Sequence, residues 1–220
     1  MTREEVCAKI NEVGIVPCAR VKVPDHVRFA AETLCRSSIP ILEVPLTLAE
    51  APAVIEELAK RYPNIVVGAG TVLDEEETQR CIDSGARFIT SPGYVPEVVA
   101  CAEKAGVCVF PGAITPSEVI AAWKAGADFV KLFPAATAGG PQYVRAVKVS
   151  LTHIPLIVTG GVNQLTAFDY ILSGATAVGI GNELLPAVAL QNKQAGRIHE
   201  LARRFTELVK EAREQLLEMQ

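Results

Sequence analysis

Two ionisable residues interrupt apolar segments of this sequence. Lys131 lies within "DFVKLFPA", and Glu43 lies within "ILEVPLT". A buried ammonium loses its hydration, so burial favours the neutral amine, which is a nucleophile near neutral pH. Such an amine attacks a ketone carbon and forms a Schiff base. The resulting iminium withdraws electrons, so a neighbouring carbon–carbon bond can break without a metal.

This chemistry also needs a group that moves protons. A carboxylate on a facing strand suits that role, and Glu43 is the candidate. Each residue alone has an ordinary structural explanation, because strand lysines often line a solvated edge and glutamates often pair with a basic neighbour. Their joint occurrence within apolar strands favours the catalytic interpretation.

Short apolar segments alternate with amphipathic segments along the chain. Strands are expected at residues 14–19, 41–44, 65–67, 88–90, 107–110, 129–132, 156–158 and 177–180. Helices are expected at residues 3–13, 25–36, 48–61, 74–84, 95–104, 116–124, 141–149 and 164–172, with a long final helix at 194–217. Continuous apolar strands between helices indicate parallel pairing with both sheet faces covered.

Glycines mark the expected returns from helix to strand. Gly85, Gly106, Gly126 and Gly174 each follow a helical segment, where glycine supplies the left-handed cap. The first three recur every 20 or 21 residues, the length of a short βα unit. Eight such units in about 200 residues predict a single (β/α)8 TIM-barrel domain over residues 1–220, with an N-terminal helix and a long C-terminal helix. A doubly wound open sheet is the alternative, but its usual Gly-x-Gly-x-x-Gly fingerprint is absent.

Composition narrows the class of partners. Half of the residues are hydrophobic, which suits a large core. The net charge is −4 without a basic block, which disfavours nucleic acid as a partner. The longest apolar runs, such as residues 154–158, are too short to span a bilayer. The N-terminal segment carries Glu4 and Glu5 and has no apolar signal core, so a cytoplasmic protein is expected.

The cysteines and histidines give no metal-binding pattern. The six cysteines form no Cys-x-x-Cys pair, and buried free thiols are the expected state. The three histidines are far apart and form no Cys/His cluster. Neither a metal nor a cofactor is expected.

The carboxyl ends of the expected strands carry possible anion-binding groups. Arg20 follows the first strand, Gly160 and Gly161 follow the seventh, and Gly181 follows the eighth. Barrels commonly hold phosphate at these last two positions through backbone N–H groups. Alternatively, the glycines only permit tight turns.

Several motifs together point to a family. They occur in the order "ILEVPLT", "VGAGTVL", "SPG", "FPGAITPSE", "VKLFPA", "GGPQYVRAVK" and "TGGV". This set, spread over residues 10 to 190, closely resembles the 2-keto-3-deoxy-6-phosphogluconate (KDPG) aldolases and their relatives acting on 4-hydroxy-2-oxoglutarate (KHG) or 2-keto-3-deoxy-6-phosphogalactonate. The resemblance implies a homotrimeric class I aldolase of Entner–Doudoroff carbohydrate metabolism. It implies small-molecule partners, with cleavage of the sugar acid to pyruvate and glyceraldehyde 3-phosphate.

The resemblance also implies roles for individual residues. Lys131 is similar to the Schiff-base lysine, and Glu43 to the general acid/base. Thr71 resembles the residue that hydrogen-bonds the pyruvyl carboxylate. Phe133 and Pro92 are expected to line the pocket.

The carboxylate site departs from the phosphogluconate pattern. Thr47 stands where that pattern places an arginine after "LEVTL". Arg20 stands where the phosphogalactonate branch has its arginine. We therefore expect Arg20 to bind the substrate carboxylate through charge-assisted contacts, with Thr47 beside it.

The expected phosphate site also differs. Gly160 and Gly161 resemble the phosphate-binding glycines, and Gly181 lies in the last loop. Asn182 and Glu183 follow where the family often has a serine. The Asn182 amide can donate to phosphate, whereas an inward Glu183 would repel it, which leaves the exact substrate open.

Two other functions remain as alternatives at this point. A phosphosugar isomerase or epimerase would share the late glycine loops but would need no covalent lysine. A non-catalytic phosphosugar-binding barrel would need neither Lys131 nor Glu43.

Overall fold

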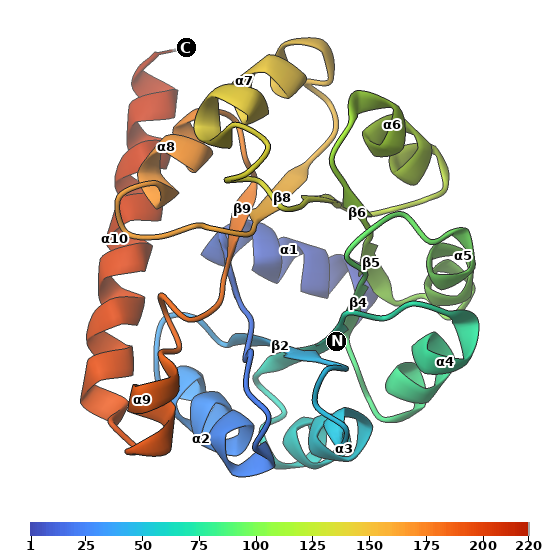
Figure 1. Ribbon diagram of the computed structural model, residues 1–220, viewed down its shortest axis with the longest axis vertical. Coiled ribbons are helices and arrows are strands. Elements are labelled where there is room, and N and C mark those ends of the chain that lie inside the picture. Colours follow the sequence, from blue (N-terminus) through green and yellow to red (C-terminus); the bar gives the residue numbers. More distant parts are fainter. Residues whose placement is uncertain (220) are drawn as a thin grey trace.

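The computed structural model describes residues 1–219 and shows a (β/α)8 barrel (Figure 1). The strands are β1 (Ile15–Pro17), β2 (Ile41–Pro45), β3 (Val66–Gly70), β4 (Phe88–Thr90), β5 (Cys108–Phe110), β6 (Gly112–Ala113), β7 (Val130–Leu132), β8 (Leu156–Thr159) and β9 (Ala177–Ile180). All paired strands are parallel, in the orders β1-β9-β8-β7-β6 and β2-β3-β4-β5.

The helices are α1 (Arg3–Val13), α2 (Pro24–Cys35), α3 (Ala51–Arg61), α4 (Glu75–Asp83), α5 (Pro96–Lys104), α6 (Pro116–Lys124), α7 (Gly140–Ser150), α8 (Ala167–Leu172), α9 (Ala187–Gln191) and α10 (Ala195–Glu218). All of them except α1 lie around the outside of the strands. The predicted strands and helices are confirmed with shifted ends, while β6 and α9 were not predicted. α8 begins later than predicted because Asn163 and Thr166 form a hydrogen-bonded turn before it.

The two groups of strands join into one barrel. Between β1 and β2, Cys18 forms a parallel bridge with Glu43, and the Ala19 N–H donates to the Glu43 carbonyl at 3.0 Å. On the other side, β5 and β6 are two parts of one strand position separated by Pro111. Proline has no N–H to donate to a sheet, although its carbonyl here accepts from the Lys131 N–H at 2.9 Å. The barrel therefore has eight strand positions.

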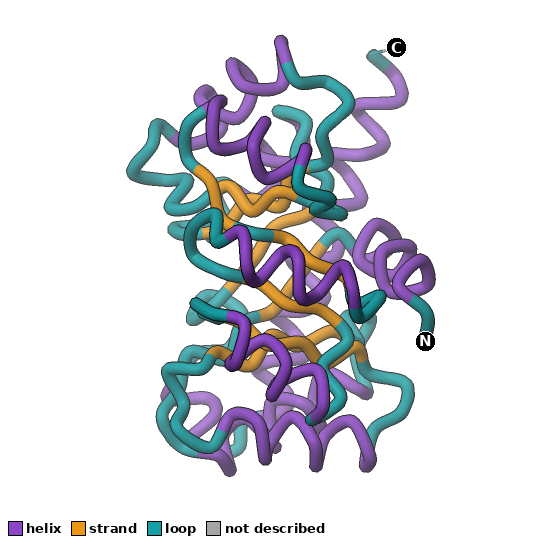
Figure 2. The backbone as a smooth tube through the Cα atoms, turned by 90° about the vertical axis from the view of Figure 1, so that its right-hand side faces the viewer, coloured by secondary structure: helices purple, strands orange, loops and turns teal. Residues whose placement is uncertain are grey.

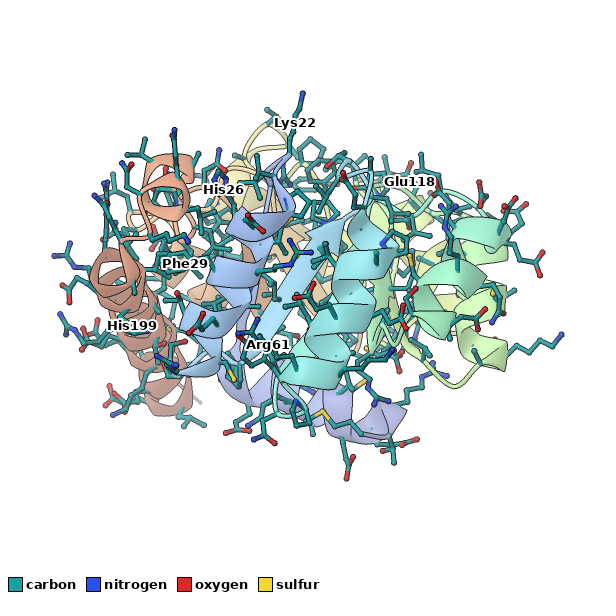
Figure 3. All side chains as sticks on the ribbon, turned by 90° about the horizontal axis from the view of Figure 1, so that it is seen from below. Lys22, His26, Phe29, Arg61, Glu118 and His199 are labelled. Carbon is teal, nitrogen blue, oxygen red and sulfur yellow. The ribbon has the colours of Figure 1, made fainter. Side chains whose placement is uncertain are left out.

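Helix α1 closes the amino end of the barrel (Figure 2). Its Ile10 is fully buried and packs with interior side chains that include Phe88, Phe110 and Phe129. The Phe88 and Phe110 rings stack with centroids 5.1 Å apart, and Phe129 meets Phe110 edge-on at 6.1 Å. Seen from the side, α1 lies at one end and Lys22, after β1, at the opposite end (Figure 3). Because apolar groups fill the amino end, the carboxyl end is left for polar chemistry.

A polar cluster fastens α1 to the barrel. Arg3 Nε donates to both Asp128 oxygens at 2.8 and 3.0 Å, and the Val109 N–H donates to Asp128 at 2.9 Å. The sulfurs of Cys7 and Cys108 lie 3.5 Å apart beside this carboxylate. This grouping was not predicted, because Cys7 and Cys108 are far apart in the chain. Since both carboxylate oxygens already accept hydrogen bonds from protein N–H groups, we assign the cluster a structural role.

The long helix α10 packs along α2 and α8. It buries Ile198, Phe205 and Val209, as its apolar spacing predicts, while Leu201 and Leu208 are only half-buried. No helix within residues 1–219 has the length and apolar character needed to cross a membrane.

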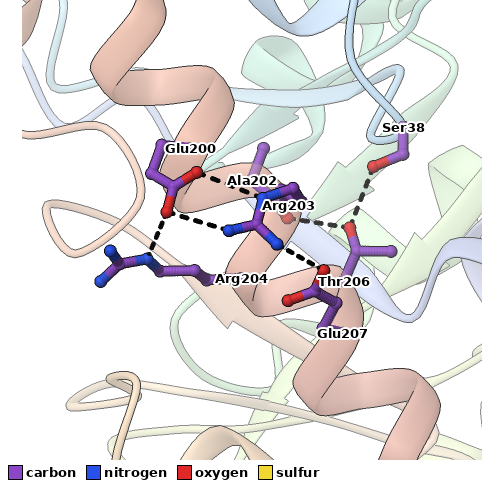
Figure 4. Close-up of polar contacts among 7 residues, drawn as sticks. All are labelled: Ser38, Glu200, Ala202, Arg203, Arg204, Thr206 and Glu207. Carbon is purple, nitrogen blue, oxygen red and sulfur yellow. Dashed lines mark hydrogen bonds and ion pairs between the residues drawn. The ribbon is translucent and has the colours of Figure 1, made fainter.

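The outer face of α10 carries a network of ion pairs (Figure 4). Arg203 and Arg204 both contact Glu200, and Arg203 also contacts Glu207. Such exposed pairs contribute about 0–1 kcal/mol each, so the buried apolar face dominates the attachment of α10.

The barrel interior leaves no room for a side chain at Gly68 of β3. A Cβ atom there would lie 2.3 Å from the Phe88 ring. We expect Gly68→Ala to lower the free energy of unfolding by about 1–3 kcal/mol through overpacking, measured by denaturant titration. Gly196→Ala is the control, because a Cβ there meets nothing within 4 Å. Equal stability of Gly68→Ala and the wild type would contradict this packing.

Candidate active site

A buried amine and a buried carboxylate face each other inside the barrel. Lys131 Nζ on β7 lies 3.7 Å from Glu43 Oε2 on β2. Each residue is 6% exposed. The two strands belong to different groups of the barrel, so closure of the barrel is what brings the two side chains together.

The alternation of side chains along each strand explains their direction. Val130 and Leu132 pack in the layer between strands and helices, so Lys131 between them points into the barrel. On β2, Ile41 belongs to the interior core. Glu43, two residues later, points the same way and lies nearer the carboxyl end.

Two neighbours shape the position of the Glu43 side chain. A Cβ atom on Gly70 would lie 2.2 Å from Glu43 Oε1, so the carboxylate occupies space that only glycine leaves free. The Cys18 thiol donates to the same oxygen at 3.2 Å. Burial, reinforced by the negative charge of Glu43, raises the pKa of the Cys18 thiol, which keeps the donor protonated. Sequence reasoning missed Cys18; the available signal was its place just beyond the end of β1, next to β2.

The amine and the carboxylate lie close enough to exchange a proton, since Lys131 Nζ is 3.7 Å from Glu43 Oε2. Transfer of one proton from Lys131 to Glu43 gives a neutral pair and a free amine. The arrangement therefore suits a nucleophile with an adjacent proton acceptor.

A small cavity of about 180 Å³ opens at the carboxyl end. It is lined by Arg20, Thr159, Gly160, Gly161, Val162, Gly179, Gly181, Asn182 and Glu183. The structure thus brings together all the predicted phosphate-site residues. Gly160 and Gly161 have φ angles of 90° and 85°, a left-handed backbone that favours glycine. Larger surface grooves exist, but the one beside α4 is lined by carboxylates and does not suit an anionic ligand.

The structure places Arg20 in this cavity, with its side chain exposed to solvent. The Arg20 guanidinium carbon lies 6.0 Å from the centroid of the Phe133 ring, and Lys131 Nζ lies 5.8 Å from the same centroid. Phe133 therefore neighbours both the amine and the anion cavity.

The remaining predicted residues do not line this cavity. Thr71 follows Gly70 directly and has a φ angle of 59°, unusual for a β-branched residue. Pro92 is half-buried in the loop after β4, where its carbonyl approaches Gly112. Thr47 is exposed in the turn after β2.

Comparison with known proteins decides the family. The model of the KDPG and KHG aldolase family matches residues 6–201. This chain belongs to that family. It is 32% identical over 194 residues to the KHG/KDPG aldolase of Escherichia coli K12, covering 88% of this chain and 91% of the relative. It is also 32% identical over 175 residues to a probable 2-dehydro-3-deoxy-6-phosphogalactonate aldolase of Rhizobium meliloti, covering 79% and 82%.

A solved structure of a KDPG aldolase shows the same fold and carries covalently bound pyruvate. KDPG aldolase from Legionella pneumophila, with pyruvate captured at low pH as a covalent carbinolamine intermediate, superposes with a TM-score of 0.83. The sequence identity is 29%, and the match covers 89% of this chain and 95% of that one. The chain is accordingly an aldolase, a carbon–carbon lyase, and the predicted (β/α)8 fold is confirmed.

The contact between Gly70 and Glu43 gives a test of the geometry. In Gly70→Ala the new methyl group would collide with the carboxylate and displace it, and a misplacement near 1 Å costs about a hundredfold in rate. We expect a loss of that order in aldol cleavage, measured by release of pyruvate. Gly196→Ala should keep the wild-type rate. If Gly70→Ala were as fast as the wild type, the Glu43 carboxylate would not need to occupy its observed position for catalysis.

Proposed function

We propose that this aldolase uses Lys131 as its Schiff-base residue and cleaves KDPG to pyruvate and glyceraldehyde 3-phosphate. The observation that carries the proposal is the buried amine 3.7 Å from a buried carboxylate at the carboxyl end of the barrel. The names of the relatives and the pyruvate carbinolamine of the Legionella enzyme support it.

The reaction begins with imine formation. Glu43 accepts a proton from Lys131, and the neutral Nζ attacks the keto carbon of the substrate. Glu43 then returns the proton to the carbinolamine hydroxyl, which leaves as water. The product is an iminium bound to Lys131.

Cleavage of the carbon–carbon bond uses the same two residues. The Glu43 carboxylate takes the proton of the C4 hydroxyl, and the electrons of the C3–C4 bond move into the iminium. The aldehyde leaves, and an enamine remains on Lys131. Protonation of the enamine at C3 by Glu43, followed by hydrolysis, releases pyruvate.

The substrate carboxylate is assigned to Arg20, with Thr71 and Thr47 as further hydrogen-bond donors. The proximity of Arg20 to Phe133, and of Phe133 to Lys131, supports this assignment. Phe133 and Pro92 are proposed to bound the apolar part of the pocket.

The phosphate is assigned to the cavity formed by Gly160, Gly161, Gly181 and Asn182. Backbone N–H groups at such strand ends suit phosphate oxygens. Glu183 is exposed at the rim, which lets it turn toward solvent when phosphate binds. Glu183 keeps KHG, which has no phosphate, as a second candidate substrate, and Arg20 keeps 2-keto-3-deoxy-6-phosphogalactonate as another.

The oligomeric state and the cellular compartment are proposed from the family resemblance and from the state of the cysteines. A homotrimer without a cofactor is proposed from the family resemblance alone. All six cysteines within residues 1–219 are free, which supports a reducing compartment such as the cytoplasm.

Borohydride reduction in the presence of pyruvate tests the covalent step. We expect wild-type protein to gain the mass of one reduced pyruvate adduct at Lys131, located by peptide mass spectrometry. Lys131→Ala should gain none and lose cleavage, and Glu43→Gln should trap slowly because proton transfer fails. Lys22→Ala is the matched control, since Lys22 is an exposed lysine at the same end of the barrel. An unchanged mass of the wild type would contradict imine formation at Lys131.

A substrate panel tests the anion sites. We expect phosphorylated 2-keto-3-deoxy acids to turn over faster than unphosphorylated ones or KHG. Arg20→Ala should raise the pyruvate concentration needed for half-maximal trapping about tenfold or more, because a charge-assisted contact is lost. If Arg20→Ala instead weakened only phosphorylated substrates, Arg20 would bind phosphate, as its place in the glycine-lined cavity also allows.

A further inference from the structure

The thiol nearest the reacting groups is that of Cys18. Its sulfur lies 3.2 Å from Glu43 Oε1, and the residue is 6% exposed. Other buried cysteines, such as Cys81 on α4, sit in the apolar layer between strands and helices. The Cys18 sulfur contacts instead the proposed acid/base.

We propose that Cys18 is a positioning residue whose S–H group holds Glu43 Oε1, so that Oε2 remains directed at Lys131. The inference rests on the proposed function, because it assigns Glu43 the proton transfers.

The backbone on both sides fixes the position of the thiol. The Cys18 N–H donates to the Ile180 carbonyl at 2.9 Å, which ties it to β9. The next N–H, of Ala19, donates to the Glu43 carbonyl at 3.0 Å, which ties it to β2. The thiol and the carboxylate therefore project from two backbone positions held in one register.

The two carboxylate oxygens have separate partners. Oε1 accepts a hydrogen bond from the Cys18 S–H. The same oxygen fills the space beside Gly70 that a side chain at that position would need. Oε2 faces Lys131 Nζ at 3.7 Å. Rotation of the carboxylate would break the thiol contact, so the hydrogen bond selects Oε2 as the oxygen that exchanges protons.

The thiol acts as a donor and not as a second nucleophile. Burial and the charge of Glu43 raise its pKa, whereas the charges of Lys131 and Arg20 oppose that rise only in part. A protonated thiol is a weak nucleophile but still donates a hydrogen bond.

The experiment compares Cys18→Val, which removes the donor at similar volume, with Cys18→Ser, which keeps a donor. Exchange of pyruvate methyl protons with solvent is followed by NMR, because it reports proton transfer without an aldehyde. Cys81→Val is the matched control, since Cys81 is also a buried cysteine but lies on α4 in the apolar layer between strands and helices.

We expect Cys18→Val to lower the exchange rate about three- to tenfold, as for loss of one weak hydrogen bond to a charged group. Cys18→Ser should stay within about twofold of the wild type, and Cys81→Val should match the wild type.

Two results would overturn the inference. One is a Cys18→Val enzyme that exchanges pyruvate protons at the wild-type rate. The other is equal slowing of Cys18→Val and Cys18→Ser, because loss of rescue by a hydroxyl donor would indicate packing alone. Failure of the wild type to exchange pyruvate protons or to be trapped by borohydride would instead remove the proposed function, and this inference with it.

Discussion

The structure depends on keeping one amine and one carboxylate out of water and within 3.7 Å of each other. Removing two charges from water costs several kcal/mol per ion, and pairing offsets that cost only when the geometry is good. Lys131 and Glu43 come from strands that are not neighbours, so their distance is set by the diameter of the closed barrel. If the barrel opened between β1 and β2, β2 would therefore shift relative to β7, and Glu43 would move away from Lys131.

The rest of the interior serves this arrangement by filling the other end. Three phenylalanine rings and helix α1 occupy the amino half, and the Arg3–Asp128 contact fastens that helix in place. Toward the carboxyl end of the barrel, glycines, which have no side chain, matter as much as the residues that have one. Gly70 leaves the space that the Glu43 carboxylate fills, and Gly160 and Gly161 allow the turn that shapes the anion cavity.

Much of this could be predicted from the sequence, because it depends on periodicity. Apolar runs separated by helices and capped by glycine indicate a parallel barrel, and the inward direction of Lys131 and Glu43 follows from alternation along a strand. The hydrogen bond from Cys18 to Glu43 was missed, because the place of Cys18 after β1 signals only that it lies near β2, and the register that brings its thiol to the carboxylate is not written in the sequence. The break at Pro111 was also missed, although a residue without an N–H was visible there.

The location of α1 has a practical consequence for handling the protein. Residue 1 emerges at the plugged end, on the side away from Lys22 and the catalytic mouth. A carrier protein or solid support joined through that terminus would leave the entrance open to small molecules. The same attachment would lie next to Arg3, whose contact with Asp128 fastens α1 to the barrel. A flexible spacer is therefore the appropriate connection for immobilising the catalyst.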